Sequence, residues 1–269
     1  MLKFRSAALL ASLTLMGSAC GTPEAGEKNT QQVSYEEFRA QAYQEPESGG
    51  FVVDGDIFLP TEAMLREFYE QAVSGTGTTE AGLAVYYSGG KDIKWSASEA
   101  LNLTYCVSTK FGSNYSKVVD ALNSATAAWE AAANINFIHV SAEDSNCTNR
   151  NSNVVFDVNP TSSTQYLARA FFPNSSRRDR NILVSTTSFG NISPWTVTGV
   201  LRHELGHTIG FRHEHTRLTS TGCYEDNAWR GLTPYDSSSV MHYPQCNGTQ
   251  TGDLVLTSND KSGARSLYP

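Results

Sequence analysis

Residues 203–213 read His203-Glu204-Leu205-Gly206-His207-Thr208-Ile209-Gly210-Phe211-Arg212-His213, and this stretch decides the fold. Apolar residues at positions 197, 201, 205 and 209 predict a helix. His203 and His207 lie four positions apart, so they share another face of that helix. Gly210 permits the backbone conformation that ends a helix, which lets the chain turn and bring His213 back as a third nitrogen ligand. The spacing predicts a three-histidine zinc site with one open coordination position.

Glu204 has a separate predicted role beside this site. Its side chain leaves the helix toward the metal without lying on the row of the two histidines, where it can act as a general base. Zinc lowers the pKa of a bound water toward neutrality, and Glu204 would take the proton and return it to the leaving amine. The plainer alternative is a helix that holds two histidines by coincidence, but here five fixed positions of the motif coincide.

The sequence resembles the metzincin clan of zinc endopeptidases, whose motif His-Glu-x-x-His-x-x-Gly-x-x-His is followed by a methionine turn. Residues 210–217, Gly-Phe-Arg-His-Glu-His-Thr-Arg, and residues 239–243, Ser-Val-Met-His-Tyr, are similar to the astacin branch of that clan. The His-Glu-x-Gly-His form and the segment Leu-Ala-Arg-Ala-Phe-Phe-Pro at 167–173 resemble the bacterial HEIGH metallopeptidases. The resemblance implies an α+β fold of metzincin type: a twisted mixed sheet with two long helices, one of them the active-site helix, and an irregular C-terminal subdomain.

The resemblance also implies roles for residues around the zinc. Met241 would lie beneath the metal as a hydrophobic floor, and Tyr243 would be a hinged extra ligand that stabilises the oxyanion. Residues 167–172 would form the edge strand that pairs with an extended substrate. Glu214 would anchor the mature N-terminus, although a surface carboxylate paired with Arg212 or Arg217 is an open alternative. The chain departs from the astacin pattern at 218–221, Leu-Thr-Ser-Thr, which leaves the substrate preference open.

Charge divides the chain into parts. Residues 21–80 carry 12 acidic and 3 basic side chains, whereas residues 81–269 carry 15 of each. A neutral main domain lacks the basic stripe of a nucleic-acid-binding protein, so we expect no nucleic-acid partner. Ser-Gly-Thr-Gly-Thr-Thr at 74–79 reads as a protease-accessible connector. We therefore expect an acidic propeptide with connector at 21–80 and a zinc metalloprotease catalytic domain at 81–269.

The acidic segment contains a candidate inhibitor of the zinc site. Val-Asp-Gly-Asp-Ile at 53–57 resembles the Phe-x-Gly-Asp motif of astacin propeptides, whose aspartate ligates the zinc in place of water. Asp56 is the matching residue, and Gly55 would let the backbone approach closely. The alternative is a plain Asp-Gly turn between two strands.

The first twenty residues predict export. A basic start, the apolar stretch 7–16 and the small residues 17–19 form a signal peptide too short to span a bilayer. Cys20 is a candidate for lipidation, which would be the only contact with a membrane, and cleavage after Ala19 without lipidation is the alternative. We expect an extracellular or envelope-anchored protein.

Four further cysteines lie in the exported part of the chain. Nearest-neighbour pairing would join Cys106 to Cys147 and Cys223 to Cys246, while other pairings and free thiols stay open.

Sequence patterns also place the other elements. Helices are expected from Ser34, after Pro60, over 116–133, from a Ser193 cap with Pro194 at the first helical position, and over 259–267. Strands are expected at 102–107, 135–140, 154–158, 167–172 and 182–185. Outside the motif, His139 is expected to be structural, and His215 and His242 to lie beside the ligands or at the surface.

These features predict an exported, monomeric zinc endopeptidase that is made as a latent precursor and acts on protein or peptide substrates. Two alternatives stay open at this point. One is a zinc amide hydrolase of cell-wall or small peptides, and the other is a zinc-binding module that no longer cleaves.

Overall fold

The computed structural model describes residues 34–74, 82–217 and 228–269. All of them belong to one of the two units into which the chain divides, Val33–Pro269. The helices are α1 Tyr35–Gln41, α2 Glu62–Ser74, α3 Ala97–Ala100, α4 Tyr115–Glu130, α5 Val197–Thr208 and α6 Ser258–Leu267. The strands are β1 Tyr43–Gln44, β2 Phe51–Val53, β3 Ile57–Leu59, β4 Gly82–Ser88, β5 Lys91–Asp92, β6 Leu103–Val107, β7 Phe137–His139, β8 Phe156–Thr161, β9 Ala168–Arg169, β10 Asn181–Ser185 and β11 Trp229–Thr233.

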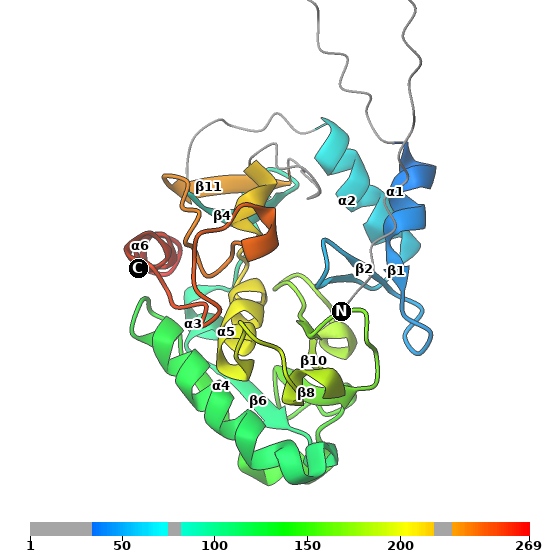
Figure 1. Ribbon diagram of the computed structural model, residues 1–269, viewed down its shortest axis with the longest axis vertical. Coiled ribbons are helices and arrows are strands. Elements are labelled where there is room, and N and C mark those ends of the chain that lie inside the picture. Colours follow the sequence, from blue (N-terminus) through cyan, green and yellow to red (C-terminus); the bar gives the residue numbers. More distant parts are fainter. Residues whose placement is uncertain (1–33, 75–81, 218–227) are drawn as a thin grey trace, which may run out of the picture. The chain divides into compact units, whose positions relative to one another are not determined.

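A five-stranded sheet in the order β7-β6-β8-β10-β9 is the centre of this unit (Figure 1). Its strands run parallel except β9, which pairs antiparallel with β10 at one edge. The predicted strands all exist, although the run expected at 167–172 is regular only at Ala168–Arg169 and the one expected at 154–158 lies at Phe156–Thr161. Buried Leu103, Val158 and Ile182 supply apolar contacts from three of the strands.

Helix α4 packs on α5 and carries the predicted apolar stripe. Val118, Leu122, Ala125 and Trp129, at spacings of four, three and four, are buried. The indole Nε1 of Trp129 donates a hydrogen bond of 2.9 Å to the carbonyl of Arg202, which ties the end of α4 to the middle of α5. The two long helices thereby fix each other beneath the site.

Helix α5 begins later than predicted. The N-cap is Thr196, whose backbone is extended and whose side-chain oxygen accepts a hydrogen bond from the amide of Gly199, and Ser193-Pro194 lies outside the helix. A turn closed by the bond from the Trp195 amide to the Ile192 carbonyl occupies the preceding residues. The prediction of a Ser193 cap was therefore wrong, because Thr196 is the residue whose backbone leaves the helical region and whose hydroxyl reaches an orphan amide.

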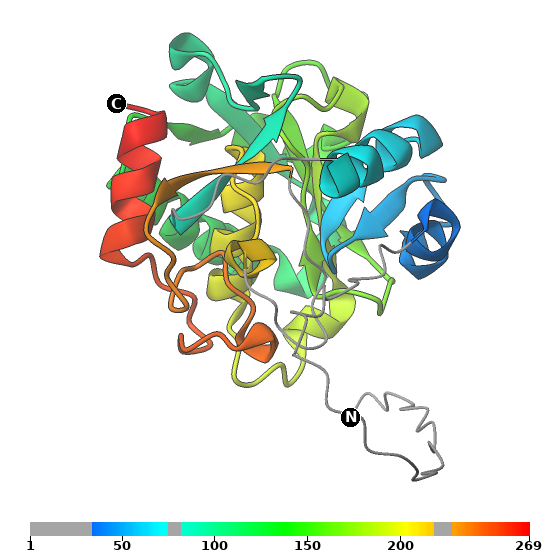
Figure 2. The same cartoon turned by 90° about the horizontal axis from the view of Figure 1, so that it is seen from above.

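Residues 34–74 form a small layer of their own, with α1, α2 and the antiparallel sheet β1-β2-β3 (Figure 2). Ser34 and Glu37 make the predicted capping box of α1, and the helix expected after Pro60 is α2. Phe68 and Leu59 from this layer share a buried cluster with Tyr86 and Phe172 of the remaining chain. The acidic segment is therefore docked on the rest of the unit through an apolar interface.

A second antiparallel sheet joins β11 of the C-terminal part to β4 and β5, and apart from β11 and α6 the described residues after 228 are irregular or in short turns of helix. Thr257 and Asp260 form a capping box at the start of α6. The predicted α+β class is confirmed, with separate helical and sheet layers. None of the helices in the described ranges is long and apolar enough to cross a lipid bilayer.

One of the two predicted disulfides joins Cys106 to Cys147, which confirms that pairing. Cys246 is buried and disulfide-bonded. Its predicted partner Cys223 lies outside the described residues, as do the signal segment 1–20, residues 75–81 of the connector and residues 218–221.

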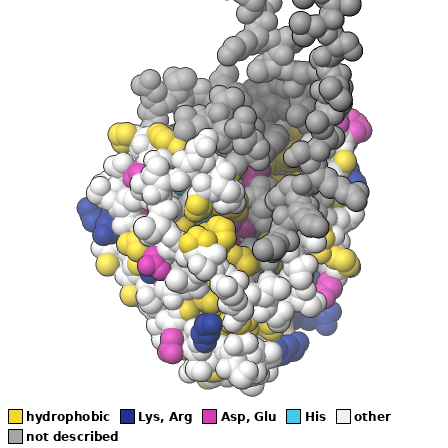
Figure 3. All heavy atoms as spheres, viewed as in Figure 1, with side chains coloured by type: hydrophobic (Ala, Val, Ile, Leu, Met, Phe, Trp, Pro, Cys, Tyr) yellow, Lys and Arg dark blue, Asp and Glu magenta, His cyan; other side chains and the backbone are white. Residues whose placement is uncertain are grey.

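On the face in Figure 3, Lys and Arg side chains lie mainly toward the margin.

Candidate metal centre

His203 and His207 project from the same side of α5 and are held by backbone carbonyls. The Nδ1 of His203 lies 2.7 Å from the carbonyl oxygen of Val240, and the Nδ1 of His207 lies 2.7 Å from that of Phe211. Because a carbonyl only accepts, each Nδ1 carries the hydrogen and donates, which leaves each Nε2 with its lone pair facing inward. The fold therefore presents two oriented nitrogen ligands.

Gly210 turns the chain so that His213 returns to the same point. Its φ of 103° lies in the left-handed region, and a Cβ there would come within 2.3 Å of the Ile93 carbonyl oxygen. The returning chain is pinned by the bond of 2.7 Å from the Arg212 amide to the Ala84 carbonyl. The Nε2 of His213 then lies 3.2 Å from the Nε2 of His203.

Asp56 enters the same space from the turn between β2 and β3. Its carboxylate oxygens lie 3.2 Å, 3.4 Å and 3.1 Å from the Nε2 atoms of His203, His207 and His213. The turn depends on Gly55, which has a φ of 93° and no room for a side chain, because a Cβ would lie 3.0 Å from the hydroxyl of Tyr243. Residues 53–57 thus contain the Asp-Gly turn between two strands, and this turn places the Asp56 carboxylate among the three histidines.

These four residues form a buried group whose ligand atoms all lie within 4.8 Å of one another. Four ligands at the zinc bond length of about 2.0–2.1 Å in a tetrahedron stand about 3.3 Å apart, which matches the distances from Asp56 to the histidines. Among the described residues, Asp56 Oδ1 and His207 Nε2 are buried atoms that lack a hydrogen-bond partner. Three imidazoles and one carboxylate are a donor set that zinc accepts, so the residues fit this metal.

The electrostatics of the group favour the protonation states that bind metal. Burial lowers the pKa of His207, and it lowers the pKa of His213 to about 3, so both imidazoles are neutral. Burial alone would raise the pKa of Asp56; positive charge at His213 and His207 lowers it well below the ordinary value, and a cation held by the neutral imidazoles would supply positive charge at the same place. Neutral histidines and an ionised carboxylate are the forms that coordinate a cation.

Glu204 and Tyr243 lie at the rim of this group. Burial, followed by the charge of Asp56, raises the pKa of Glu204 well above its ordinary value, and its Oε2 has no hydrogen-bond partner among the described residues. The hydroxyl of Tyr243 donates to Asp56, and its ring stacks 5.5 Å from that of His203. Burial also raises the pKa of Tyr243, which keeps the phenol protonated. Tyr243 thus contacts the carboxylate of Asp56, and Glu204 is buried close enough to be affected by its charge.

Met241 lies against the underside of α5 and is fully buried. A Cβ on Gly206 would stand 2.4 Å from its sulfur and 3.2 Å from the Trp129 ring. The glycine of the His-Glu-x-Gly-His form therefore gives Met241 its place below the two histidines, as the resemblance implies.

Several polar residues around the site are more deeply buried than the sequence indicates. His215 and His242 are both buried, so a surface position is wrong for either. The His215 ring stacks 4.8 Å from that of His213, and the His242 Nε2 lies 2.8 Å from the Tyr235 hydroxyl. Glu214 is buried as well, and its carboxylate accepts the amide of Asp236. The only signal in the sequence for the burial of Glu214, His215 and His242 was that they lie within a few residues of His213 and Met241.

His139 is confirmed as a structural residue away from the metal centre. Its Nε2 lies 3.0 Å from the carboxylate of Asp144, which also accepts the amide of Val107 at 2.8 Å.

Two buried ion pairs, which sequence reasoning missed, join the acidic segment to the site. Arg212 lies 3.1 Å from Asp54, and Arg169 lies 2.8 Å from Glu45. Each arginine belongs to a motif that the sequence singled out, and each acid comes from residues 34–74. The excess of acidic side chains in residues 21–80 was a signal for ion pairs with the rest of the chain, but which arginines they meet depends on tertiary packing.

The backbone of the predicted substrate strand also contacts the acidic segment. Ala170, directly after β9, donates to the Asp56 carbonyl at 3.2 Å and accepts from the Phe58 amide at 3.4 Å. Ile57 and Ala170 form a parallel bridge. The edge of the central sheet next to the metal group is therefore covered by residues 56–58.

Comparison with known proteins finds partial matches to this chain. High choriolytic enzyme 2 of Oryzias latipes is 35% identical over 63 aligned residues, and the match covers 17% of this chain and 22% of that protein. An astacin-like metalloendopeptidase of Coturnix japonica is 36% identical over 77 residues, 22% of this chain and 19% of that protein. The chain thus spans about a fifth of the length of these curated relatives. The solved structure of myroilysin aligns with a TM-score of 0.48 at 18% identity, covering 69% of this chain and 98% of that one.

A family match covers most of the chain. The model of the dual-action HEIGH metallo-peptidases matches residues 64–268, a range that includes α5, the methionine turn and the central sheet. The expectation of a HEIGH-type metallopeptidase with an astacin-like motif is confirmed, and the protein belongs to the family of dual-action HEIGH metallo-peptidases.

Proposed function

We propose that the protein is a zinc endopeptidase that its own acidic segment keeps latent, with Asp56 as the blocking ligand. The observation that carries the proposal is the carboxylate of Asp56 at 3.1–3.4 Å from the inward nitrogens of His203, His207 and His213. The family and the buried donor set support zinc. His203, His207 and His213 would hold the ion in both states, and the position of Asp56 would pass to water and substrate after activation.

The catalytic roles follow from the side chains around this position. A bound zinc ion would polarise the peptide carbonyl and acidify water. Glu204 would accept the proton of the attacking water at its carboxylate and deliver it to the leaving nitrogen. Tyr243, protonated because its pKa is raised, would donate a hydrogen bond to the developing oxyanion once Asp56 has left.

Asp56 would also weaken the general base directly. Its negative charge is the second cause, after burial, of the raised pKa of Glu204. A protonated Glu204 cannot accept a proton, so the latent state disfavours the step for which Glu204 is proposed. Departure of Asp56 removes this charge and frees the base, in addition to opening the coordination position.

An extended substrate would take the place of residues 56–58 on the edge strand. Ala170 already offers its amide and carbonyl to a peptide backbone there. Backbone pairing accepts any extended sequence, which suits an endopeptidase better than a hydrolase of small amides. The presence of Glu204 argues against a module that binds zinc without cleaving.

The blocking role of Asp56 is tested with two variants of the full chain. Asp56→Ala should raise the hydrolysis of a short fluorogenic peptide by the uncleaved chain about tenfold or more, because water regains a ligand position. Glu47→Ala, a change at an exposed acid of the same segment, is the matched control and should leave the rate unchanged. The latch is refuted if both variants carry one zinc, unfold cooperatively and hydrolyse the peptide at the wild-type rate.

The proposal includes export and the division of the chain. Residues 1–20 would be a signal peptide with Cys20 as a lipid anchor, residues 21–80 the propeptide with its connector, and residues 81–269 the catalytic domain. Palmitate should label the wild-type chain in a bacterial host and not the Cys20→Ala variant. Labelling of both chains would refute the anchor.

A further inference from the structure

We propose that Arg169 is the centre of a substrate subsite for an acidic side chain, about two residues from the residue that takes the place of Asp56. The inference deepens the proposed function and rests on it, because the acidic segment must first leave the edge strand. The activated enzyme would then prefer peptides that carry Asp or Glu at that position.

Arg169 is a buried cation in the latent state, with 1% of its surface exposed. Its Nε and Nη2 donate to the two carboxylate oxygens of Glu45 at 2.8 Å and 2.9 Å, a two-pronged arrangement that fits the guanidinium fork. On the other side, Nη1 donates to the amide oxygen of Asn181 at 2.6 Å. Among the described residues, Glu45 is its only ion-pair partner.

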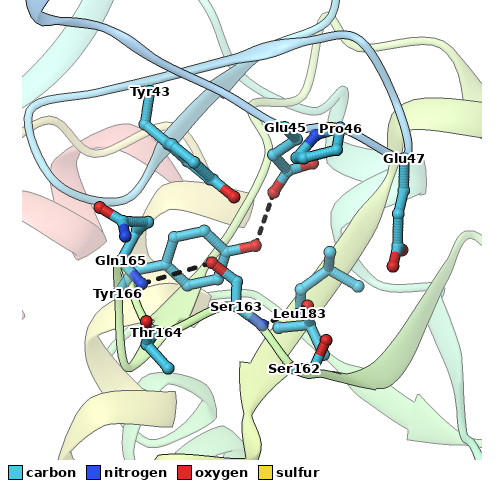
Figure 4. A pocket seen from close by; sticks show the side chains of 11 residues that line it. Tyr43, Glu45, Pro46, Glu47, Ser162, Ser163, Thr164, Gln165, Tyr166 and Leu183 are labelled. Carbon is cyan, nitrogen blue, oxygen red and sulfur yellow. Dashed lines mark hydrogen bonds between the residues drawn. The ribbon is translucent and has the colours of Figure 1, made fainter.

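A second donor points at the same carboxylate. The hydroxyl of Tyr166 donates to Glu45 Oε1 at 2.6 Å, and Figure 4 shows the two side chains meeting below Tyr43 and Pro46. Arg169 and Tyr166 both belong to the catalytic part of the chain, whereas Glu45 belongs to the acidic segment. The catalytic part therefore contributes only donors to the Glu45 carboxylate, and a carboxylate is the group that can accept from Arg169 and Tyr166 together.

The groups that cover the fork and one face of the guanidinium belong to the acidic segment and would leave with it, whereas Asn181 stays bonded to Nη1. Glu45 occupies its fork, and the ring of Phe58 covers its face with the guanidinium carbon 3.9 Å from the ring centre. A pocket of about 300 Å³ already opens beside Glu45 between residues 43–47 and 161–166. Once the segment has gone, a buried cation without its anion faces an open groove, and a substrate carboxylate restores the pair.

The subsite lies within reach of a peptide on the edge strand. Arg169 ends β9, and its neighbour Ala170 bonds to the backbone of residues 56 and 58. Phe58, the residue whose ring covers Arg169, is two positions after Asp56.

A purely structural role for Arg169 predicts a different outcome. Its bond to Asn181 helps to hold β9 on β10, so removing the side chain could lower the overall activity without changing the preference for acids. The ratio of rates on an acidic peptide and on its amide analogue separates the two roles, because instability lowers both rates alike.

The test uses the full chain with the site of a sequence-specific viral protease inserted between residues 75 and 81. After cleavage and removal of the released segment, the wild type, Arg169→Gln, Arg169→Lys and Arg178→Gln digest a pool of proteome-derived peptides, and mass spectrometry locates the cleaved bonds. A matched Glu/Gln peptide pair built on the preferred position then gives kcat/KM. Arg178 is the control because it is an exposed arginine nearby.

The wild type should cleave the Glu peptide about tenfold faster than the Gln peptide. Arg169→Gln should bring this ratio to about one, Arg169→Lys should keep part of it, and Arg178→Gln should keep all of it. An equal ratio in the wild type and in Arg169→Gln, or a wild type without acidic preference, would overturn the subsite while leaving the endopeptidase intact.

Loss of the proposed function gives a distinguishable result. If the activated wild type cleaves no peptide, the endopeptidase proposal fails, and the subsite is then tested by retention of the same peptide pool. Enrichment of acidic peptides on the wild type but not on Arg169→Gln supports the subsite. Equal retention on both overturns it.

Discussion

Single residues of the metal centre are oriented before any metal binds. The Nδ1 atoms of His203 and His207 are both fixed on backbone carbonyls at 2.7 Å, so the inward nitrogens have little freedom to lose. His139 offers a contrast, because its imidazole is tied to Asp144 instead. Orientation by a backbone carbonyl distinguishes His203 and His207 from the structural histidine.

His207→Ala should abolish stable zinc binding, because it leaves two imidazoles, one fewer than the three protein ligands of a catalytic zinc site. Metal analysis of the purified chain should find about one zinc in the wild type and close to none in this variant. His139→Gln is the control and should retain the metal. Equal zinc content in all three chains would place the ion elsewhere.

Tyr243→Phe should separate binding from rate. The hydroxyl faces the position of Asp56, so its loss should leave the zinc content unchanged and lower kcat of the activated chain about 100-fold. Tyr115→Phe is the control. It removes a hydroxyl that donates to Asp144, which is not part of the metal centre, and should leave kcat unchanged. Full activity of Tyr243→Phe would remove the proposed role on the oxyanion.

Helical spacing was enough to predict that His203 and His207 share one face of α5, because one turn of helix separates them, and the glycine at 210 was the signal for the return of His213. Arg169, Arg212 and His215 were out of reach. Their burial depends on which distant segments cover them, and nothing in the local pattern of a charged residue records that.

At the scale of elements, Gly210 converts the end of α5 into a ligand-bearing turn. Gly210→Ala should destabilise the chain by about 2 kcal/mol or more, because a side chain would meet both an unfavourable φ and the Ile93 carbonyl. Chemical denaturation followed by circular dichroism measures the loss. Gly190→Ala, where a Cβ meets only one atom at 3.4 Å, should change stability by much less. Similar values for the two variants would contradict this account of the turn.

Element boundaries show where local patterns stop being informative. The capping box at Ser34 and the apolar stripe of α4 were sufficient to predict these two helices, because each signal lies within or directly beside the helix. The start of α5 was misplaced, since Ser193-Pro194 and Thr196 both fit a cap and only the surrounding turn selects Thr196. The edge strand was expected at six residues, but the contacts of Ala170 with the acidic segment replace regular pairing there.

At the scale of the whole molecule, residues 34–74 combine apolar docking with buried ion pairs. The pair of Glu45 and Arg169 makes the docking sensitive to acid. Burial raises the pKa of Glu45, but the bonds and charge of Arg169, assisted by the hydroxyls of Tyr166 and Ser48, hold the net pKa below 4.5. Its contribution to stability is therefore present above pH 4.5 and is lost as the pH falls through the lowered value.

Glu45→Gln should lower the free energy of unfolding of the full chain by about 2 kcal/mol at pH 7, because it leaves Arg169 buried without its anion. The difference from the wild type should shrink as the pH falls below 4.5 and vanish below the lowered pKa, where the carboxyl of the folded wild type is protonated too. Denaturation at pH 7, 5, 4 and 3 gives the profile, with the exposed Glu47→Gln as control. A difference that is constant across these values would show that Glu45 is not ionised in the docked state.

The general organisation was predictable because the charge contrast and the motif lie in separate parts of the chain. The docking was not, since the apolar interface of Phe68 and Leu59 with Tyr86 and Phe172 joins residues far apart in the sequence. Pattern reasoning placed Asp56 in the metal centre only through its resemblance to a propeptide motif.

The most direct test of the central claim is the rate of casein hydrolysis by the full chain before and after cleavage at a viral protease site inserted between residues 75 and 81, with Glu204→Gln treated in parallel. If both chains bind about one zinc and only the wild type becomes active, and if a chelator abolishes that activity, the latent zinc endopeptidase is established. If the zinc-loaded wild type stays inert after the segment has been removed, or if Glu204→Gln is equally active, the account is contradicted.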